Sequence, residues 1–95
     1  MLYIIHWTVT TENRNAALAR FVQTGGVPPA NLKVLGRWHA IGSRQGFAVA
    51  ETDDVSLVLK WVLDWSDLMD MQVYPAMTDE QAAPLLKAVV SQMSI

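Results

Sequence analysis

Three polar side chains stand among apolar residues at positions that we expect to lie in a sheet: His6, Arg37 and His39. A neutral imidazole with apolar neighbours can accept a proton as a general base, or it can orient a carbonyl group. A guanidinium beside an imidazole suits a carboxylate or an enolate, because its planar fork donates two hydrogen bonds at once. These three residues are therefore the candidates for catalysis or for polar contacts with a ligand.

Each of these candidates also has a structural interpretation. Buried histidines more often bind a backbone or side-chain partner than take part in a reaction, so a structural role for His6 is the commoner outcome. Arg37 and His39 share one face of a strand that we expect at the sheet edge, where charged side chains discourage pairing with another chain. Binding a ligand and protecting the sheet edge are therefore two alternative roles for Arg37 and His39.

The aromatic residues are the main signal in the composition. Four tryptophans in 95 residues indicate large flat surfaces that need cover. Trp7, Trp38 and Trp61 are candidate walls of a ligand pocket, and the Tyr74 hydroxyl is a candidate hydrogen-bond partner for a bound polar group. Trp61 and Trp65 lie one helical turn apart, a spacing that is more typical of core packing than of a ligand site.

The sequence shows no metal or phosphate motif. His6, His39, Glu51 and Asp70 offer ligand atoms, but no two of them lie one helical turn apart, so we expect neither a metal nor another cofactor. The pair Gly25–Gly26 precedes prolines and not a helix, so it lacks the context of a phosphate-binding loop.

Charge and cysteine content narrow the class of partner. Lys and Arg number 7 against 9 Asp and Glu, and the basic residues form no stripe, so we do not expect nucleic acid as a partner. Without cysteine there is no disulfide and no thiol chemistry, so the expected location is the cytoplasm. The apolar residues 1–5 end at His6, which is too short for a membrane segment.

Four segments have the composition and alternation of strands. Residues 2–9 are rich in β-branched and aromatic side chains without Gly or Pro, which predicts the first strand. Residues 32–40 and 45–51 alternate on either side of a short polar loop and predict a hairpin. Residues 69–76 predict a fourth strand, and Pro75 near its end suits a sheet edge.

Three segments have helical spacing. The first helix is predicted from a cap at Thr10 or Thr11 to about Gln23, with Gly25–Gly26 as a left-handed stop. The second begins after Asp53 or Asp54 and carries an apolar stripe from Val55 to Trp65. The third follows a capping box at 78–81, and Pro84 is expected to kink it or delay its start.

This order predicts one α+β domain over residues 1–95, with the ferredoxin-like βαββαβ sandwich and an extra C-terminal helix. The first strand is apolar on both faces, with Ile4 on one and Ile5 on the other, so covering one face with helices leaves an apolar face open. A twofold dimer with its sheets face to face would bury that face, and the terminal helix would embrace the partner's edge. Alternatively, the terminal helix folds back over its own sheet and the protein stays a monomer.

Several segments together resemble a known family: His6–Thr8, Glu12–Ala17, Thr24–Pro29, Leu35–His39, Gly46–Glu51, Lys60–Trp61 and Trp65–Asp67. The chain is similar over nearly its whole length to short bacterial proteins described only as a domain of unknown function, in the dimeric α/β barrel superfamily. The resemblance implies a homodimer whose sheets form a barrel. It also implies a cavity, which other members of the superfamily use for cofactor-free oxygenation, isomerisation, haem handling or ligand sensing, but it carries over no catalytic residue.

We therefore predict a small homodimeric barrel protein that binds a small carbonyl-bearing or aromatic metabolite between its sheet and its helices. In that site His6, Arg37 and His39 would make the polar contacts, and Trp7, Trp38 and Trp61 would form the walls. If the protein is an enzyme, proton abstraction or cofactor-free oxygenation is the chemistry that these residues allow. The alternative is a non-enzymatic structural or regulatory interaction protein, whose tryptophans fill the dimer core.

Overall fold

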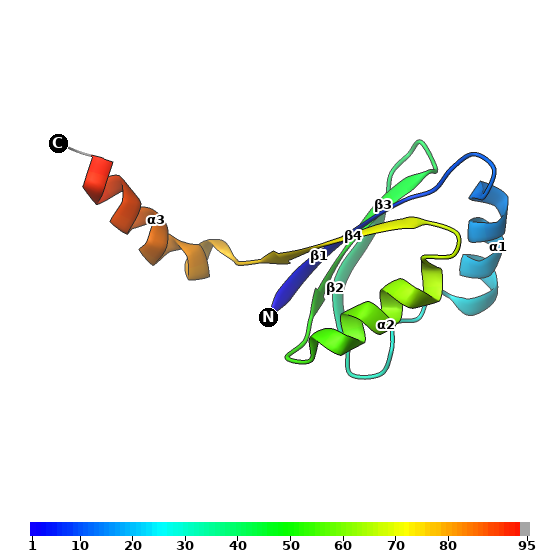
Figure 1. Cartoon of the computed structure of the whole chain (residues 1–95), viewed down its shortest axis with the longest axis horizontal. Coiled ribbons are helices and arrows are strands. Elements are labelled where there is room, and N and C mark those ends of the chain that lie inside the picture. The colour runs from blue at the N-terminus through cyan, green and yellow to red at the C-terminus, as the bar shows by residue number, and fades with distance from the viewer. Residues whose placement is uncertain (94–95) are drawn as a thin grey trace.

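A four-stranded antiparallel sheet forms the centre of the computed structural model, which describes residues 1–93 (Figure 1). The elements follow the order β1 (Leu2–Thr8), α1 (Arg14–Thr24), β2 (Lys33–His39), β3 (Gln45–Glu51), α2 (Val55–Trp65), β4 (Asp70–Ala76) and α3 (Asp79–Met93). The strands lie in the order β2-β3-β1-β4. The predicted ferredoxin-like βαββαβ arrangement with an additional C-terminal helix is thereby confirmed.

The two faces of the sheet differ in burial. On the helix face, Tyr3 pairs with Ala50 and Ile5 pairs with Ala48, and all four side chains are buried. On the open face Ile4 and Phe47 of the same strands are exposed, and His6 and Val49 are half-buried. Side chains alternate along a strand, so the burial pattern arises because the helices cover only one face of the sheet.

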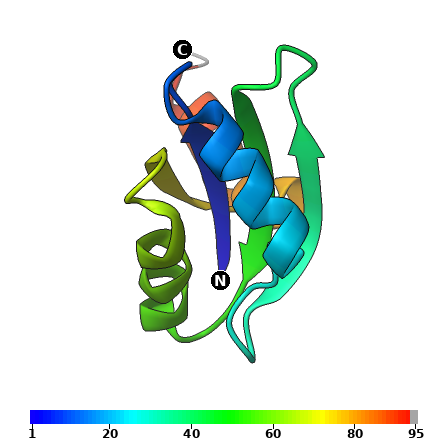
Figure 2. The ribbon, with the colours of Figure 1, turned by 90° about the vertical axis from the view of Figure 1, so that its right-hand side faces the viewer.

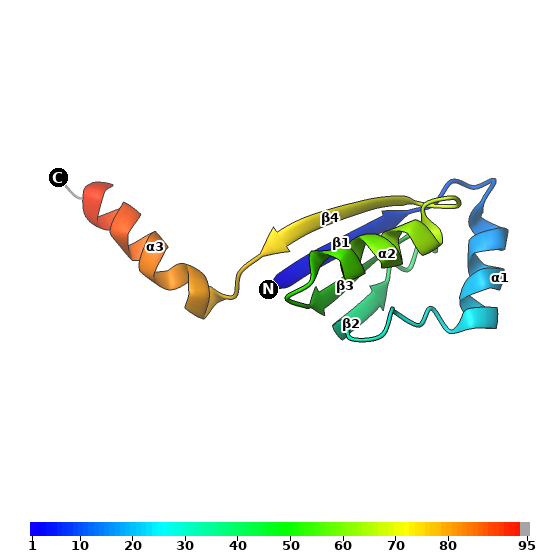
Figure 3. The same ribbon diagram turned by 60° about the horizontal axis from the view of Figure 1, so that its bottom comes forward.

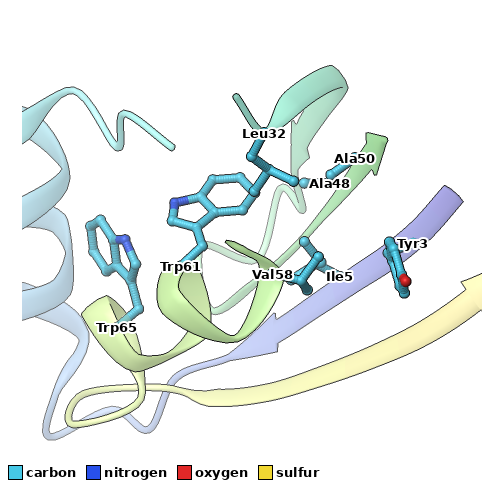
Figure 4. Packing of buried hydrophobic residues seen from close by; sticks show 8 residues of the cluster. All are labelled: Tyr3, Ile5, Leu32, Ala48, Ala50, Val58, Trp61 and Trp65. Atoms are coloured by element: carbon cyan, nitrogen blue, oxygen red, sulfur yellow. The ribbon is translucent and has the colours of Figure 1, made fainter. Parts of the chain in front are cut away.

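The core lies between the helix face and α2. It comprises Tyr3, Ile5, Leu32, Ala48, Ala50, Val58, Trp61 and Trp65 (Figure 4). The alanines of β3 carry small side chains at the centre of the sheet, which leaves room for the two indole rings of α2. The predicted packing role of Trp61 and Trp65 is confirmed, because both side chains are buried.

The boundaries of α2 follow from its capping residue. The Asp54 carboxylate accepts a hydrogen bond from the Ser56 backbone N–H at 3.0 Å, so the second of the two predicted caps is the one used. Val58, Trp61 and Trp65 then face the sheet at helical spacing. The predicted stripe was too broad at its start, because Val55 is exposed in the first turn.

Helix α1 begins later than predicted and stands at one end of the sheet, across the strand direction (Figures 1 and 3). The chain after β1 first makes a turn in which the Asn13 N–H donates to the Thr10 carbonyl at 3.2 Å, so no helix starts at Thr10 or Thr11. The predicted left-handed stop is confirmed at Gly25, whose φ is 71°. Only Ala17 of α1 is buried, and Figure 2 shows the helix in front of the strands when viewed from its end of the molecule.

A bidentate ion pair fastens α1 to the segment after α2. Arg20 Nη1 and Nη2 donate to the two carboxylate oxygens of Asp67 at 2.7 and 2.8 Å, and Nη1 also donates to the Asp64 carbonyl at 3.0 Å. The guanidinium lies 5.6 Å from the centre of the Trp65 ring, within the range of a cation–π contact. The pair therefore holds α1 beside the C-terminal end of α2.

The hydrogen bonds from Arg20 lower the pKa of Asp67 below that of an ordinary aspartate. Because the folded-state pKa is the lower one, the stabilisation is complete above the pKa of the unfolded chain and is lost as the pH falls through the folded value. We expect carbon NMR of the Asp67 carboxyl to show a low titration midpoint that rises in Arg20→Gln. The same midpoint in both proteins would show that the pair does not form in solution.

Helix α3 extends away from the rest of the molecule, and with it the structure is 56 Å long and 18 Å thick (Figure 1). Its predicted capping box is confirmed, because the Thr78 N–H donates to Gln81 Oε1 at 2.9 Å and the Gln81 N–H donates to Thr78 Oγ1 at 3.1 Å. The helix starts at Asp79, so Pro84 does not delay it. No α3 residue among those described is buried, so the helix does not fold back over its own sheet as the monomer alternative requires.

Within residues 1–93, no helix combines the length and the apolar character needed to cross a membrane.

Candidate functional site

The strand register places three of the predicted site residues on the helix face. Trp7 of β1 and His39 of β2 both pair with Gly46, and Arg37 pairs with Ala48. These residues therefore share the face on which Ile5 is buried. The prediction that Arg37 and His39 lie on one face of their strand is confirmed.

The other predicted residues of the sheet lie on the open face. His6 and Trp38 both pair with Phe47, and Tyr74 pairs with Ile4. The sheet therefore separates His6 and Trp38 from Arg37 and His39, and the structure does not bring these predicted site residues together. Trp61, from α2, belongs with the helix-face group.

A cavity of about 90 Å³ lies on the helix face, between the sheet, α1 and α2. Its walls are largely aromatic and apolar and include Trp7, Phe21, Trp61, Trp65 and Met69. Pockets for drug-sized ligands usually enclose roughly 300–1,000 Å³. The cavity therefore suits a small molecule, or one end of a larger molecule that extends through the opening.

His39 is held at this cavity by aromatic rings. Its imidazole makes edge-to-face contacts with Trp7, at a centroid distance of 5.9 Å and an interplanar angle of 71°, and with Phe21, at 5.1 Å and 84°. Within residues 1–93, neither ring nitrogen of His39 has a hydrogen-bond partner. The imidazole is thus oriented by packing, and its nitrogen atoms remain available to a bound molecule.

Arg37 lines the same cavity but already binds the end of α1. Its Nη1 donates to the Gly26 carbonyl at 2.6 Å, and its Nη2 donates to the Gly25 carbonyl at 3.3 Å. Its guanidinium also lies 4.8 Å from the centre of the Phe21 ring. A Cβ on Gly26 would lie only 2.8 Å from Arg37 Nη1, so the glycine permits this contact. Arg37 therefore positions α1 against β2, with part of its donor set left for a ligand.

Residues 1–90, from β1 into α3, match the family described as Domain of unknown function (DUF3303). The chain belongs to this family. The resemblance inferred from the sequence segments is thereby confirmed.

Three solved structures resemble this DUF3303 chain. A Nitrosomonas europaea protein assigned as an antibiotic biosynthesis monooxygenase has 12% sequence identity and a TM-score of 0.47, with 82% of this chain and 100% of that chain covered. An uncharacterized NIPSNAP domain protein from Burkholderia xenovorans has 12% identity and a TM-score of 0.44, with 82% and 96% covered. A Deinococcus radiodurans protein, also assigned as an antibiotic biosynthesis monooxygenase, has 11% identity and a TM-score of 0.39, with 82% and 94% covered. A search of curated proteins finds no match.

On the open face of this DUF3303 chain, His6 sits in a polar cluster. Its ring stacks on Phe47 at a centroid distance of 4.5 Å, and its Nδ1 and Nε2 lie 3.2 and 3.0 Å from the side-chain oxygens of Gln72 and Gln45. The Tyr74 hydroxyl donates to the same Gln72 oxygen at 3.0 Å. Both ring nitrogens of His6 are thus occupied, which agrees with the structural interpretation of this residue.

Trp38 is a predicted wall residue that lies on the open face, and its indole packs over Gly36 of its own strand. A Cβ on Gly36 would overlap Trp38 Cη2, and the β2–β3 register shifts between Val34 and Gly36. The predicted bulge or close approach at Gly36 is confirmed in both respects. Trp38 is exposed and lies outside the cavity.

Sequence reasoning did not single out Arg14 and Arg44, which also line the cavity. They come from the start of α1 and from the hairpin loop, and Arg14 Nε donates to the Ser43 hydroxyl of that loop at 3.0 Å. Nothing local in the sequence indicates that these segments, about thirty residues apart, come together. Among the described residues, no group of three or more His, Asp or Glu could hold a metal ion.

Proposed function

We propose that this chain binds a small carbonyl-bearing or aromatic molecule in the cavity between its sheet and its helices. The observation that carries the proposal is the cavity, which combines aromatic walls with the His39 imidazole and the Arg37 guanidinium. Ligand sites typically have such a composition, in which apolar walls supply affinity and a few polar groups fix orientation.

The chemistry that this arrangement suits is proton abstraction next to a carbonyl group. The His39 imidazole, oriented by Trp7 and Phe21, would accept the proton. The Arg37 N–H groups that do not bind Gly25 and Gly26 would stabilise the oxyanion that forms. Binding without turnover is the simpler form of the proposal. In both forms we assign the polar contacts to His39 and Arg37 and not to His6, which pairs with Phe47 on the open face.

The test is native mass spectrometry of the purified protein, which reports any retained small molecule. Ala17 is buried in α1 and lines the cavity, whereas Ala16 beside it is exposed. We expect the wild-type protein and Ala16→Leu to retain the same small mass, and Ala17→Leu, whose larger side chain fills the cavity, to lose it. Equal retention by both variants would place the ligand elsewhere, and a bare wild-type protein would count against binding.

A second candidate function is association with another copy of this chain, and the exposed apolar surface favours it. Leu85, Leu86, Val89 and Val90 of α3 are exposed, although an isolated helix of this length is only marginally stable in water. The open face also exposes apolar side chains, Phe47 among them. Monomeric proteins rarely leave such surfaces uncovered, and a twofold dimer would bury both of them at once, since each copy supplies a helix and a face.

The dimer is tested by placing a negative charge either on the apolar stripe of α3 or on its opposite side. We expect light scattering at tens of micromolar to show a dimer for the wild type and for Ala88→Glu, and a monomer for Leu86→Glu. Both variants add one negative charge to the same helix, but only Leu86 belongs to the apolar stripe. A monomeric wild type would contradict the dimer, and equal dissociation of both variants would show that charge and not the stripe is responsible.

A further inference from the structure

Trp61 carries a buried donor without an acceptor. Its indole Nε1 is the only buried side-chain nitrogen or oxygen within residues 1–93 that lacks a hydrogen-bond partner. The residue is 6% exposed and lines the cavity. Buried N–H groups are nearly always hydrogen-bonded, because an unpaired one gives up its bonds to water without replacement. The orphaned donor therefore calls for an acceptor that the chain itself does not supply.

The orientation of the ring places this donor on the cavity side. In Figure 4 the benzo ring of Trp61 lies toward Leu32, and the nitrogen end of the indole points toward α1. Helix α1 forms the opposite wall of the cavity through Ala17 and Phe21. An acceptor atom of a molecule between the two helices would therefore meet the Trp61 N–H.

The charged side chains around the cavity indicate the sign of the ligand. Arg14, Arg37 and Arg44 line it, and no Asp or Glu does. None of these arginines belongs to the ion pairs found within residues 1–93, and they donate hydrogen bonds to neutral hydroxyl, amide and backbone oxygens. Three guanidinium groups without a carboxylate make the cavity favourable to an anion.

We infer that the cavity takes a small apolar or aromatic monocarboxylate, and that an oxygen of this ligand accepts a hydrogen bond from Trp61 Nε1. The inference rests on the proposed function, because it requires that the cavity binds a small molecule. It adds the chemical class of that molecule and identifies Trp61 as the residue that distinguishes an oxygen-bearing ligand from a hydrocarbon of the same shape.

The test compares benzoate with toluene, which has a similar ring but no oxygen, and with benzamide, which has the oxygen but no charge. The indole N–H signal of Trp61 is identified in proton–nitrogen NMR spectra from Trp→Phe variants at the other three positions, so that Trp61 itself stays intact. We expect benzoate to move this proton signal downfield. We also expect benzoate to bind about tenfold more tightly than toluene, with benzamide between them.

Two variants distinguish the effect of the Trp61 N–H on binding from the effect of its aromatic ring. Trp61→Phe keeps an aromatic ring without the N–H, and we expect it to weaken benzoate binding about tenfold while leaving toluene binding unchanged. Trp38→Phe makes the same replacement on the open face and should change neither. If Trp61→Phe does not fold, the indole shift in the intact protein still decides the matter.

Three results would overturn the inference. Benzoate that shifts the backbone amides of Ala17 and His39 but not the Trp61 indole would mean that the cavity binds without this donor, so the proposed function would stand alone. Equal affinity for benzoate and toluene would remove the preference for an anion. No shift with any probe would contradict the ligand class, whereas the proposed function is judged separately by the small mass that the purified protein retains.

Discussion

Replacing Ile5 with alanine is expected to lower the free energy of unfolding by about 2–5 kcal/mol, because a large side chain is removed from a packed core. Ile5 lies on a central strand and is 1% exposed. It belongs to the core cluster of Val58, Trp61 and the β3 alanines, so little water can enter to fill the space that it leaves. Urea unfolding followed by tryptophan fluorescence, at one protein concentration, measures the change.

The matched control for this change is Ile4→Ala, one residue earlier on the same strand. Ile4 is 37% exposed on the open face, so the same truncation should cost about 1 kcal/mol or less in the unfolding of the chain. In the proposed dimer, Ile4→Ala should instead weaken association, which light scattering detects. Equal losses of stability at the two positions would contradict the assignment of the sheet faces.

Replacing Gly46 with alanine is expected to cost about 1–3 kcal/mol of the free energy of unfolding, because the added methyl group has no space. Its Cβ would overlap the Trp7 indole at Cζ2 and would lie 2.7 Å from the Trp38 backbone oxygen. The indole must move, and since Trp7 also forms a wall of the cavity, the change should deform the proposed ligand site. Calorimetry measures the stability, and the NMR signal of the Trp7 indole N–H reports the displacement.

Gly42→Ala provides the control for this second prediction. A Cβ on Gly42 meets no atom within 4 Å, and the residue does not lie in the left-handed region. The substitution should therefore change stability by no more than about 0.5 kcal/mol, or raise it slightly by restricting the unfolded chain. A loss at Gly42 as large as that at Gly46 would mean that the contact with Trp7 is not the cause.

The sequence predicted the order of the elements because each of them has a strong local signal. The β-branched and aromatic residues at positions 2–9 predicted the first strand, and the spacing of Trp61 and Trp65 predicted a packed helix side. The start of α1 was missed because the threonines at 10 and 11 are both acceptable caps, and a turn that ends at Asn13 uses this segment instead.

The grouping of the candidate site residues could not be predicted from alternation alone. The bulge between Val34 and Gly36 inserts one residue into β2 and reverses which side chains face the helices after it. Val34 and Arg37 are three residues apart, yet both pair with alanines of the helix face. Whether Arg37 shares a face with His6 depends on this bulge, which the sequence only hinted at through its glycine. The partners of Arg37 were also hidden, because they are backbone carbonyls and carry no signature in the side-chain sequence.

The position of α1 at the end of the sheet determines the route by which a molecule would reach the cavity. This helix buries only Ala17, and side-chain contacts from Arg20 and Arg37 fasten it near its C-terminal end. Swinging it outward would break these contacts and the Arg14–Ser43 hydrogen bond and would uncover Phe21, whereas displacing α2 would unpack two buried tryptophans. The residence time of a bound molecule would then depend on the surface contacts of Arg20 and Arg37. Substitutions at these contacts would change the rate of ligand exchange without changing the core that stabilises the fold.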